Sequence, residues 1–568
     1  MRSRALLTAA ALACALAATA PPAAADSAPV PTGAQCAAVR AHRTLAPVEA
    51  YDPRPGAVRV FAIQYKQDLA NVVSYTAFRT KIECLIRQDV LPRLARGRPN
   101  LVVFPEDTGL MTLATGSRGA EARRRFGGPG APGCESQGAP CSTVAALGAI
   151  TAAYGPQVAA YKARFPSLGP LAAAFVAATD TLVRSFMETF SDLARRYGIY
   201  IVASNDQAPF TTSSDPVDVA LFRDPDQPPP ASVYVATSPD VHNEAFLWGP
   251  EDVRATGPAP LRNVVASNLK VPLTPIELEL GLTPGPSSGP AAIANLRPYA
   301  LPGTAARLGL ATSLPAFIYG SPPPGTDPCS DTSLYYMRCL DRLGANVVLQ
   351  DEANPGRWTG PDADPREQWQ PLSWMGSAYR AVSDPTVHFA YDVNPMMTGN
   401  LADLPFDGQT AITQRGLSGP GCHYIGNTGF LSGEDRPDLA AYAGPQPDFL
   451  ALAPWVSPDG SRTQLRRAGA QLAPGSGSPL ENDYAETAAV ADLPIPADAR
   501  RPGCAAGPAP THAQPPRRHH RRRHDRHHHR HPAHRRRHDR APQPGRDRLD
   551  ADQRYQRPSS AATSSPWR

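Results

Sequence analysis

In the first part of the chain, two short apolar runs flank a segment in which apolar residues recur at helical spacing. Residues 58–64 read Val-Arg-Val-Phe-Ala-Ile-Gln, which predicts a buried strand. Apolar positions over 72–96 recur at helical spacing, so we expect an amphipathic helix that ends by Gly97, with Pro92 kinking it or stopping it early. A second strand is predicted at residues 101–104. This order of strand, helix and strand is typical of a βαβ-like unit in an α/β fold.

The same rhythm resumes after an interruption. Residues 111–170 are rich in Gly, Pro and Ala, and we interpret them as an insertion over one rim of the domain. A helix is then expected over 182–197, ended by Gly198, before a strand at 199–204. Further strands are predicted at residues 232–237, 243–248, 307–314, 346–350 and 386–391, with a helix near 331–343. The predicted strand-to-helix turns carry no dinucleotide or phosphate-loop glycine pattern, so we expect chemistry without a cofactor.

The first residues resemble an export signal. Arg2 and Arg4 precede an apolar run from Leu6 to Ala18, and three alanines then precede Asp26, where the mature chain is expected to begin. No later stretch reaches the ~18–20 apolar residues that a membrane span needs. We therefore expect a secreted, extracytoplasmic protein with no transmembrane segment after signal removal.

Composition divides the rest of the chain. The predicted parts are a signal at residues 1–25, a Pro- and Ala-rich linker at 26–55, one large domain at 56–460, and a tail at 461–568. Within that tail, residues 517–540 hold eleven arginines against two aspartates. This run accounts for the positive net charge of +5 of the whole chain, so the folded part is close to neutral or acidic. Such a run cannot bury a core and is expected to be disordered. It could bind anionic surfaces or, through its histidines, metal ions; the alternative is a solvated tail without a partner.

Eight of the nine cysteines follow the signal, in a compartment where disulfides persist. The closest pairs in sequence, Cys134 with Cys141 and Cys329 with Cys339, would close short loops, although spacing alone leaves the pairing open. The folded region contains no CxxC pair and no Cys/His cluster with zinc spacing. No metal centre is predicted.

Two charged residues stand where predicted strands end. Glu106 follows the strand at 101–104, and partial burial there would raise its pKa toward that of a useful base. Lys270 follows the apolar run 264–266 and precedes Pro272, which places it in a constrained loop. The structural alternatives are a helix-capping or ion-paired carboxylate for Glu106, and for Lys270 a surface lysine whose stem covers apolar neighbours.

Several sequence blocks resemble those of the nitrilase, or carbon-nitrogen hydrolase, superfamily. They are FPEDTG at 104–109, NLKVPLTPIE at 268–277, RLGLATSLPAF at 307–317 and LGANVVLQDEANPGRW at 343–358, with a looser block DLPFDGQTAI at 403–412. The resemblance runs from about Val58 to about Trp455. It implies an αββα sandwich of α/β class that pairs across subunits, hence a possible homodimer.

The resemblance also implies a chemistry. Members of the superfamily hydrolyse nitriles, amides or carbamoyl groups, or transfer acyl groups, with a Glu, a Lys and a Cys and without a cofactor. Glu106 would then be the base, Lys270 the partner of the developing anion, and Glu277 the supporting glutamate. The expected substrate is a small-molecule amide or nitrile.

The nucleophile departs from the family pattern. The family cysteine stands at the end of the strand Leu308–Thr312, and the next residue here is Ser313, a weaker nucleophile that needs an effective base. The alternative is Cys329, which lies in a Cys-Ser-Asp segment after a proline-rich excursion and could be tied to Cys339 as a disulfide.

Two functions follow. The first is an exported hydrolase of a non-peptide carbon-nitrogen bond that uses Glu106, Lys270 and Ser313 or Cys329. The second, which follows from Ser313, is a catalytically degenerate binding protein that keeps the same pocket. A nucleic-acid-binding protein driven by the tail ranks last, because the predicted folded region carries no basic motif.

Overall fold

The computed structural model describes residues 28–41, 44–127, 142–354, 370–401, 404–406, 408–417, 449–453, 485–497 and 505–506. These residues belong to one compact unit, Met1–Thr511. The predicted export signal and the Arg/His-rich run lie outside the described residues. Among the helices of the described part, none is both long and apolar enough to cross a membrane.

Two sheets form the centre of the unit. The first has the order β1 (Val48–Ala50), β17 (Thr487–Leu493), β2 (Val58–Lys66), β3 (Asn100–Val103), β4 (Tyr200–Gln207), β7 (His242–Trp248) and β8 (Val264–Leu269), with β13 (Met397–Leu401) and β14 (Leu404–Phe406) attached beside β2. The second has the order β18 (Ala505–Ala506), β16 (Ala451–Leu452), β15 (Ala411–Gln414), β12 (Tyr391–Asn394), β11 (Val347–Leu349), β10 (Arg307–Leu310) and β9 (Tyr299–Ala300). A separate pair joins β5 (Phe210–Ser213) to β6 (Val233–Ala236).

The two sheets pack face to face. Val60 and Ala62 of β2 alternate with Phe61 and Ile63, and the first two belong to an apolar core shared with β10, β11 and β12 of the second sheet. Phe61 and Ile63 point the other way, into a core formed with helices. Because side chains alternate between the faces of a strand, a strand buried on both faces reads as the continuous apolar run that the sequence shows.

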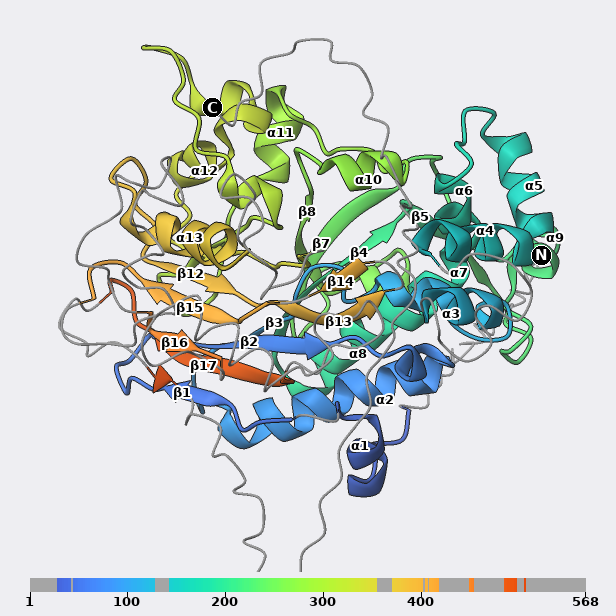
Figure 1. The fold of residues 1–568 in the computed structure, drawn as a ribbon, viewed down its shortest axis with the longest axis horizontal. Helices are drawn as coiled ribbons and strands as arrows, with labels where there is room; N and C mark the ends of the chain where they lie inside the picture. Colours follow the sequence, from blue (N-terminus) through green and yellow to red (C-terminus); the bar gives the residue numbers. More distant parts are fainter. Residues whose placement is uncertain are drawn as a thin grey trace, which may run out of the picture. The chain divides into compact units, whose positions relative to one another are not determined.

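Helices cover the outer face of each sheet. The first sheet is covered by α2 (Tyr75–Leu85), α3 (Ala120–Phe126), α4 (Thr143–Ala153), α5 (Gly155–Arg164), α6 (Ala172–Ala177), α7 (Thr179–Leu182) and α8 (Glu188–Tyr197). The second is covered by α11 (Gly289–Asn295), α12 (Thr332–Arg342) and α13 (Gln370–Ser383). Figure 1 shows these layers, with α13 over β12 and β15 on one side and α2 against β17 and β2 on the other. The predicted α/β class and αββα sandwich are confirmed.

Local sequence explains where the elements begin and end. Ser74 caps α2 by accepting a hydrogen bond from the amide of Ala77, and the helix passes into irregular turns over Ile86–Val90 and Leu91–Arg93, where Pro92 lies. Gly198 ends α8 with φ of 64°. The strand predicted at 386–391 is displaced, because β12 starts only at Tyr391.

The predicted insertion at 111–170 is part of the fold. It forms α3, α4 and α5, and Phe126, Ile150 and Tyr161 from these helices belong to the same apolar core as the outer face of the first sheet. The sequence did not indicate this role, because the helices are rich in alanine and only a few of their side chains are large enough to stand out as core positions.

The predicted linker at 26–55 is wrong as a description of residues 28–55. This segment contains α1 (Gly33–Val39), whose Cys36 forms a disulfide with Cys84 of α2, and β1, which pairs in parallel with β17. Its proline and alanine content suggested a linker, whereas long-range pairing makes it an edge of the first sheet.

The predicted domain end at residue 460 is wrong as well. Strand β17 lies between β1 and β2, antiparallel to β2 from Thr487↔Gln64 to Leu493↔Val58. Its alanines and valine fill both faces of the sheet, which is why an alternating pattern is absent from the sequence.

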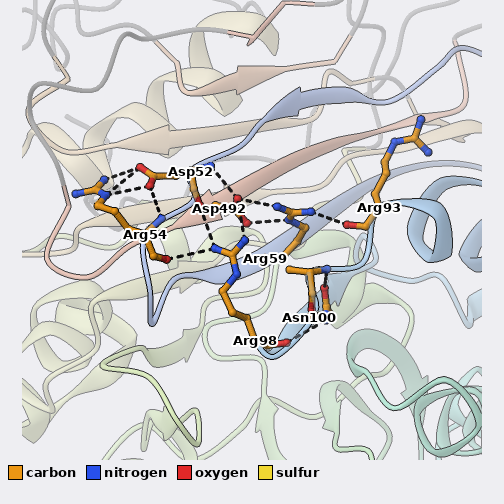
Figure 2. A network of polar contacts seen from close by, with 8 residues as sticks. Asp52, Arg54, Arg59, Arg93, Arg98, Asn100 and Asp492 are labelled. Atoms are coloured by element: carbon orange, nitrogen blue, oxygen red, sulfur yellow. Dashed lines mark hydrogen bonds and ion pairs between the residues drawn. The ribbon is translucent and has the colours of Figure 1, made fainter.

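A polar network anchors this late strand. The Asp492 carboxylate accepts hydrogen bonds from Arg59 Nε at 2.8 Å and Arg59 Nη2 at 2.7 Å, and from the amide of Asp52 at 2.8 Å. Arg98 Nη2 lies 3.5 Å from the same carboxylate. Figure 2 shows these arginines converging on Asp492 from β2 and from the turn before β3. The segment after β1 and strand β17 are thereby joined to β2 and to the turn before β3.

Candidate active site

Glu106 and Lys270 come together at the ends of strands of the first sheet. Glu106 follows β3 and is 2% exposed, and Lys270 follows β8 and is also 2% exposed. The backbone of Lys270 is fixed on both sides: its amide donates to the carbonyl of Asn243 at 2.9 Å, and its carbonyl accepts from the amide of Gly285 at 2.9 Å. The strand-end positions inferred from the sequence therefore meet in space.

These two residues belong to a four-residue cluster. Lys270 Nζ donates to Glu106 Oε1 at 2.6 Å and lies 2.9 Å from Glu277 Oε2. Asn243 Nδ2 donates to Glu106 Oε1 at 2.8 Å and to Glu277 Oε1 at 2.9 Å. Glu277 is fixed by α10 (Pro275–Glu279), because its carboxylate accepts from both the amide and the hydroxyl of the helix cap Thr274.

The charges in the cluster respond to burial and to one another. Burial alone would lower the pKa of Lys270, but Glu106 and Glu277 raise it above its ordinary value. Burial would raise the pKa of Glu277, but Lys270 and the bonds from Thr274 hold it below its ordinary value. For Glu106 burial outweighs Lys270, so its pKa is raised. The result is an ammonium, a carboxylate and a second carboxyl that has the character of a base.

Ser313 occupies a strained turn after β10. Its φ of 56° and ψ of −117° are unusual for a residue with a side chain, and the short helix Leu314–Phe317 begins directly after it. The turn is held by the Ser313 amide, which donates to the carbonyl of Asp351 at 3.0 Å, and by the Ser313 carbonyl, which accepts from Ala316 at 2.9 Å. Strained backbone of this kind gathers at functional sites, where surrounding contacts hold a side chain in one orientation.

The segment after β11 connects Ser313 to Glu106. The amide of Ala353 donates to Glu106 Oε2 at 3.0 Å. The neighbouring Glu352 is completely buried and receives a hydrogen bond from Gln350 Nε2 at 2.6 Å. Burial and the charge of Glu106 raise the pKa of Glu352, while Gln350, Lys270 and the hydroxyl of Ser313 lower it. Glu352 therefore adjoins both the Glu106–Lys270 pair and Ser313.

Comparisons with known proteins give a match at the level of solved structures. No protein-family model matches the chain, and no curated protein matches it. Several solved structures do match. They include an amidase from Nesterenkonia sp. (13% identity, 63% of this chain and 85% of that chain, TM-score 0.29) and a carbon-nitrogen hydrolase from Helicobacter pylori (11% identity, 63% and 82%, TM-score 0.35).

A third match is a protein from Saccharomyces cerevisiae described as a member of branch 10 of the nitrilase superfamily, with 12% identity over 63% of this chain and 83% of that chain, and a TM-score of 0.31. At these identities the likeness concerns the fold alone, and the chemistry is carried by the side chains described above.

The alternative nucleophile, Cys329, is bonded to Cys339 in a disulfide with an S–S distance of 2.02 Å. Both cysteines are buried among apolar residues of α12 and its neighbours. A disulfide sulfur carries no thiolate and cannot attack a carbonyl carbon. Ser313 is the candidate that the structure leaves in this role.

Sequence reasoning missed four polar residues around the cluster. Asn243 lies within β7 and joins Glu106 to Glu277, while Asp107, Asp206 and Glu352 are carboxyls that share its electrostatic environment. A usable signal existed for Asp206, because the polar run Ser204–Gln207 ends a buried strand. Asn243 gave none, since one polar residue in a strand is ordinary.

Gly109 explains how the Glu106 loop seats against β4. Its amide donates to the carbonyl of Ser204 at 3.2 Å, and a Cβ there would lie 2.6 Å from Asn205 Cγ.

Within the described ranges, no group of three or more His, Cys, Asp or Glu side chains is arranged to hold a metal ion.

Proposed function

We propose that the protein is an exported hydrolase of the nitrilase superfamily that acts on a non-peptide carbon-nitrogen bond of an amide or nitrile. The observation that carries the proposal is the strained turn at Ser313, next to the segment whose Ala353 amide binds Glu106. A nucleophile position, a buried carboxyl with a raised pKa and a buried ammonium are the groups that acyl transfer needs.

The reaction on an amide then runs in two halves. Ser313 Oγ attacks the carbonyl carbon while Glu106 takes the hydroxyl proton, and Lys270 stabilises the negative charge on the carbonyl oxygen. The carbon-nitrogen bond breaks, the departing amine takes the proton from Glu106, and an ester to Ser313 remains. Glu106 next takes a proton from water, the resulting hydroxide attacks the ester, and the acid leaves as Ser313 regains its proton.

Ammonia release from a panel of short aliphatic amides and nitriles tests this assignment. We expect turnover by the mature chain, and a loss of at least about 100-fold in S313A and in E106Q, because each removes a group that acts in the transition state. S117A is the matched control, since Ser117 is exposed and its hydrogen bonds to Asp226 and Ala120 are made by its backbone amide and carbonyl. Full activity in either site variant, with the fold intact by circular dichroism, would remove that residue from the mechanism.

A second test uses the thiol that the family has at this position. S313C should react with iodoacetamide at position 313, because a thiol beside a basic carboxyl is a far better nucleophile than a hydroxyl. S117C controls for accidental labelling, and peptide mapping separates the label from native cysteines. If position 313 reacts no faster than position 117, the site does not activate a nucleophile.

The second candidate function is a binding protein that has lost turnover. The specific observation in its favour is the hydroxyl of Ser313 where the family has a thiol. Binding of an amide by the wild type, measured by calorimetry, together with the absence of ammonia release and a gain of turnover in S313C, would establish this function over the first.

Export is part of the proposal. Two disulfides, Cys36–Cys84 and Cys329–Cys339, support it, because such bonds persist in oxidising compartments. The expected result is a mature protein outside the cytoplasm whose N-terminal sequence begins near Asp26. Sedimentation of that protein tests the homodimer that the resemblance implies, and its binding to anionic vesicles with and without residues 512–568 tests the proposed role of the tail.

A further inference from the structure

The candidate site contains more carboxyl groups than its reaction uses. Besides Glu106 and Glu277, the carboxyls of Asp107, Asp206, Asp351 and Glu352 act electrostatically on this cluster, and Lys270 is the cation among them. A buried carboxyl is costly unless it is neutral, ion-paired or hydrogen-bonded. The mechanism proposed above gives Asp107 and Asp206 no role.

The backbone brings these two aspartates together. Asp206 lies directly across from Asn243 in the pairing of β4 with β7, and Asn243 is the residue that binds both Glu106 and Glu277. Asp107 follows Glu106 in a left-handed turn with φ of 56°. Its amide donates to Ser204 Oγ at 3.0 Å, and Ser204 is two residues before Asp206 on the same face of β4.

Unpartnered acceptors gather at this place. Asp107 Oδ1 and Asp206 Oδ1 are buried and have no hydrogen-bond partner. The same is true of two amide oxygens: Oδ1 of Asn243, which is 1% exposed and whose Nδ2 binds the catalytic cluster, and Oε1 of Gln67, which is 5% exposed and whose Nε2 reaches the carbonyl of Asp107. Four buried acceptors in one place are complementary to a group that offers several N–H donors.

We propose that the substrate carries a positively charged group with N–H donors, a primary ammonium or a guanidinium, and that Asp107 and Asp206 bind it beside the amide attacked by Ser313. This inference rests on the proposed function and adds a substrate class to it. An ammonium brings three donors and one positive charge, which satisfies acceptors that have no partner in the protein and offsets the excess of carboxyls.

The arrangement also predicts a proton exchange. Burial, with the charge of Asp206 next, raises the pKa of Asp107, and burial, with the charges of Glu277 and Glu106 next, raises that of Asp206. A bound cation favours their ionised forms, so binding should release a proton and strengthen as pH rises. The other charged groups that act on this pair are Glu106, Glu277 and Lys270.

Steady-state kinetics of the full mature enzyme test the substrate class. The panel compares ω-amino amides with two to five methylenes, such as 5-aminopentanamide, with neutral pentanamide and anionic 4-carbamoylbutanoate. We expect kcat/KM to be highest for one of the amino amides and lowest for the anion, with a preference for the cation of about tenfold or more, as a desolvated charge pair provides.

The variant D206N tests the residue assignment. The ratio of kcat/KM for the best amino amide to that for pentanamide should fall at least about tenfold, because the carboxylate that faces the cation is gone. D107N should act in the same direction. D252N is the matched control, since Asp252 is exposed and pairs with Arg195 on the surface, and it should leave the ratio unchanged.

A binding measurement separates this inference from the proposed function. If the wild type hydrolyses no amide, the proposed function fails, and calorimetry with pentan-1-amine against pentan-1-ol decides the inference alone. Selective binding of the amine, with proton release seen as a buffer-dependent heat and loss in D206N, supports the cation subsite. Equal or absent binding of the two, a preference for neutral amides, or an unchanged ratio in D206N overturns it.

Discussion

Lys270 is surrounded by two carboxylates, so replacing it by methionine should change stability in a way that depends on pH. The ammonium lies 2.6 Å from Glu106 and 2.9 Å from Glu277, and all three side chains are at most 8% exposed. Removing one partner from a buried ionic cluster typically costs about 3–5 kcal/mol, because the other charges stay buried without compensation. We expect K270M to lose about that much free energy of unfolding at pH 8.

The sign of the pH dependence follows from the pKa shifts. In the wild type the raised pKa of Lys270 gives stability that is fully present below the unfolded value of about 10.4. The lowered pKa of Glu277 gives stability that is fully present above about 4.3 and is lost as pH falls through its folded value. Both contributions are therefore constant between about pH 5 and 9.

Without Lys270 the pKa of Glu106, which is already raised, should rise further, and that of Glu277 should change from lowered to raised in the folded state. The folded protein would then bind more protons than the unfolded chain near neutrality, so its stability would fall as pH rises, by up to about 1.4 kcal/mol per pH unit for each extra proton. The loss in K270M should be smallest near pH 5 and largest near pH 8.

Urea unfolding followed by tryptophan fluorescence at pH 5, 6.5 and 8 measures this effect. K162M is the matched control, because Lys162 is exposed in the last turn of α5 and its loss should change stability little at any pH. A loss in K270M that is equal at all three pH values, or no larger than in K162M, would refute the electrostatic account of the cluster.

Three further outcomes are expected. D492N should lower the free energy of unfolding by about 3–5 kcal/mol, because Arg59 loses a buried carboxylate, whereas the surface variant D252N should cost under about 1 kcal/mol; equal effects would contradict the anchoring role. C36S/C84S, which removes the Cys36–Cys84 bond, should lower the free energy of unfolding by about 4 kcal/mol, and loss of the Cys329–Cys339 bond should lower it by about 3 kcal/mol. The first bond has the larger effect because it closes a loop of 48 residues and the second a loop of 10; the opposite order in urea unfolding would count against this. Finally, kcat/KM should rise with pH along a limb displaced above the ordinary glutamate value of about 4.3, since the pKa of Glu106 is raised, and a limb at or below that value would exclude Glu106 as the base.

The sequence predicted those parts of the fold that local patterning determines. Strands β2 and β3 and the first half of β4 consist mostly of apolar residues, and α2 and α8 show helical spacing with recognisable ends, so their positions followed from the chain alone. Glu106 and Lys270 were predicted because each follows a predicted apolar run and lies in a sequence block that resembles the nitrilase superfamily.

Long-range pairing could not be predicted in this way. Strand β17 consists largely of alanine and follows a Pro- and Gly-rich stretch, so only its partners β1 and β2 make it a strand. Asn243 was missed for the same reason. It matters because the pairing of β7 with β4 places it opposite Asp206 and beside Glu106, and nothing in its local sequence indicates these neighbours.

The position of β17 bears on how the protein reaches its folded state. Gln64 of β2 donates to the carbonyl of Ala485, 421 residues later in the chain. During synthesis, the edge of β2 therefore stays unpaired until almost the whole domain has emerged, and an open strand edge can pair with other chains. A chain that stopped before residue 485 would also leave β1 without its neighbour in the sheet. Strand β17 thus closes the first sheet only in a chain that extends past it, because a shortened chain would keep an open strand edge that is prone to aggregation.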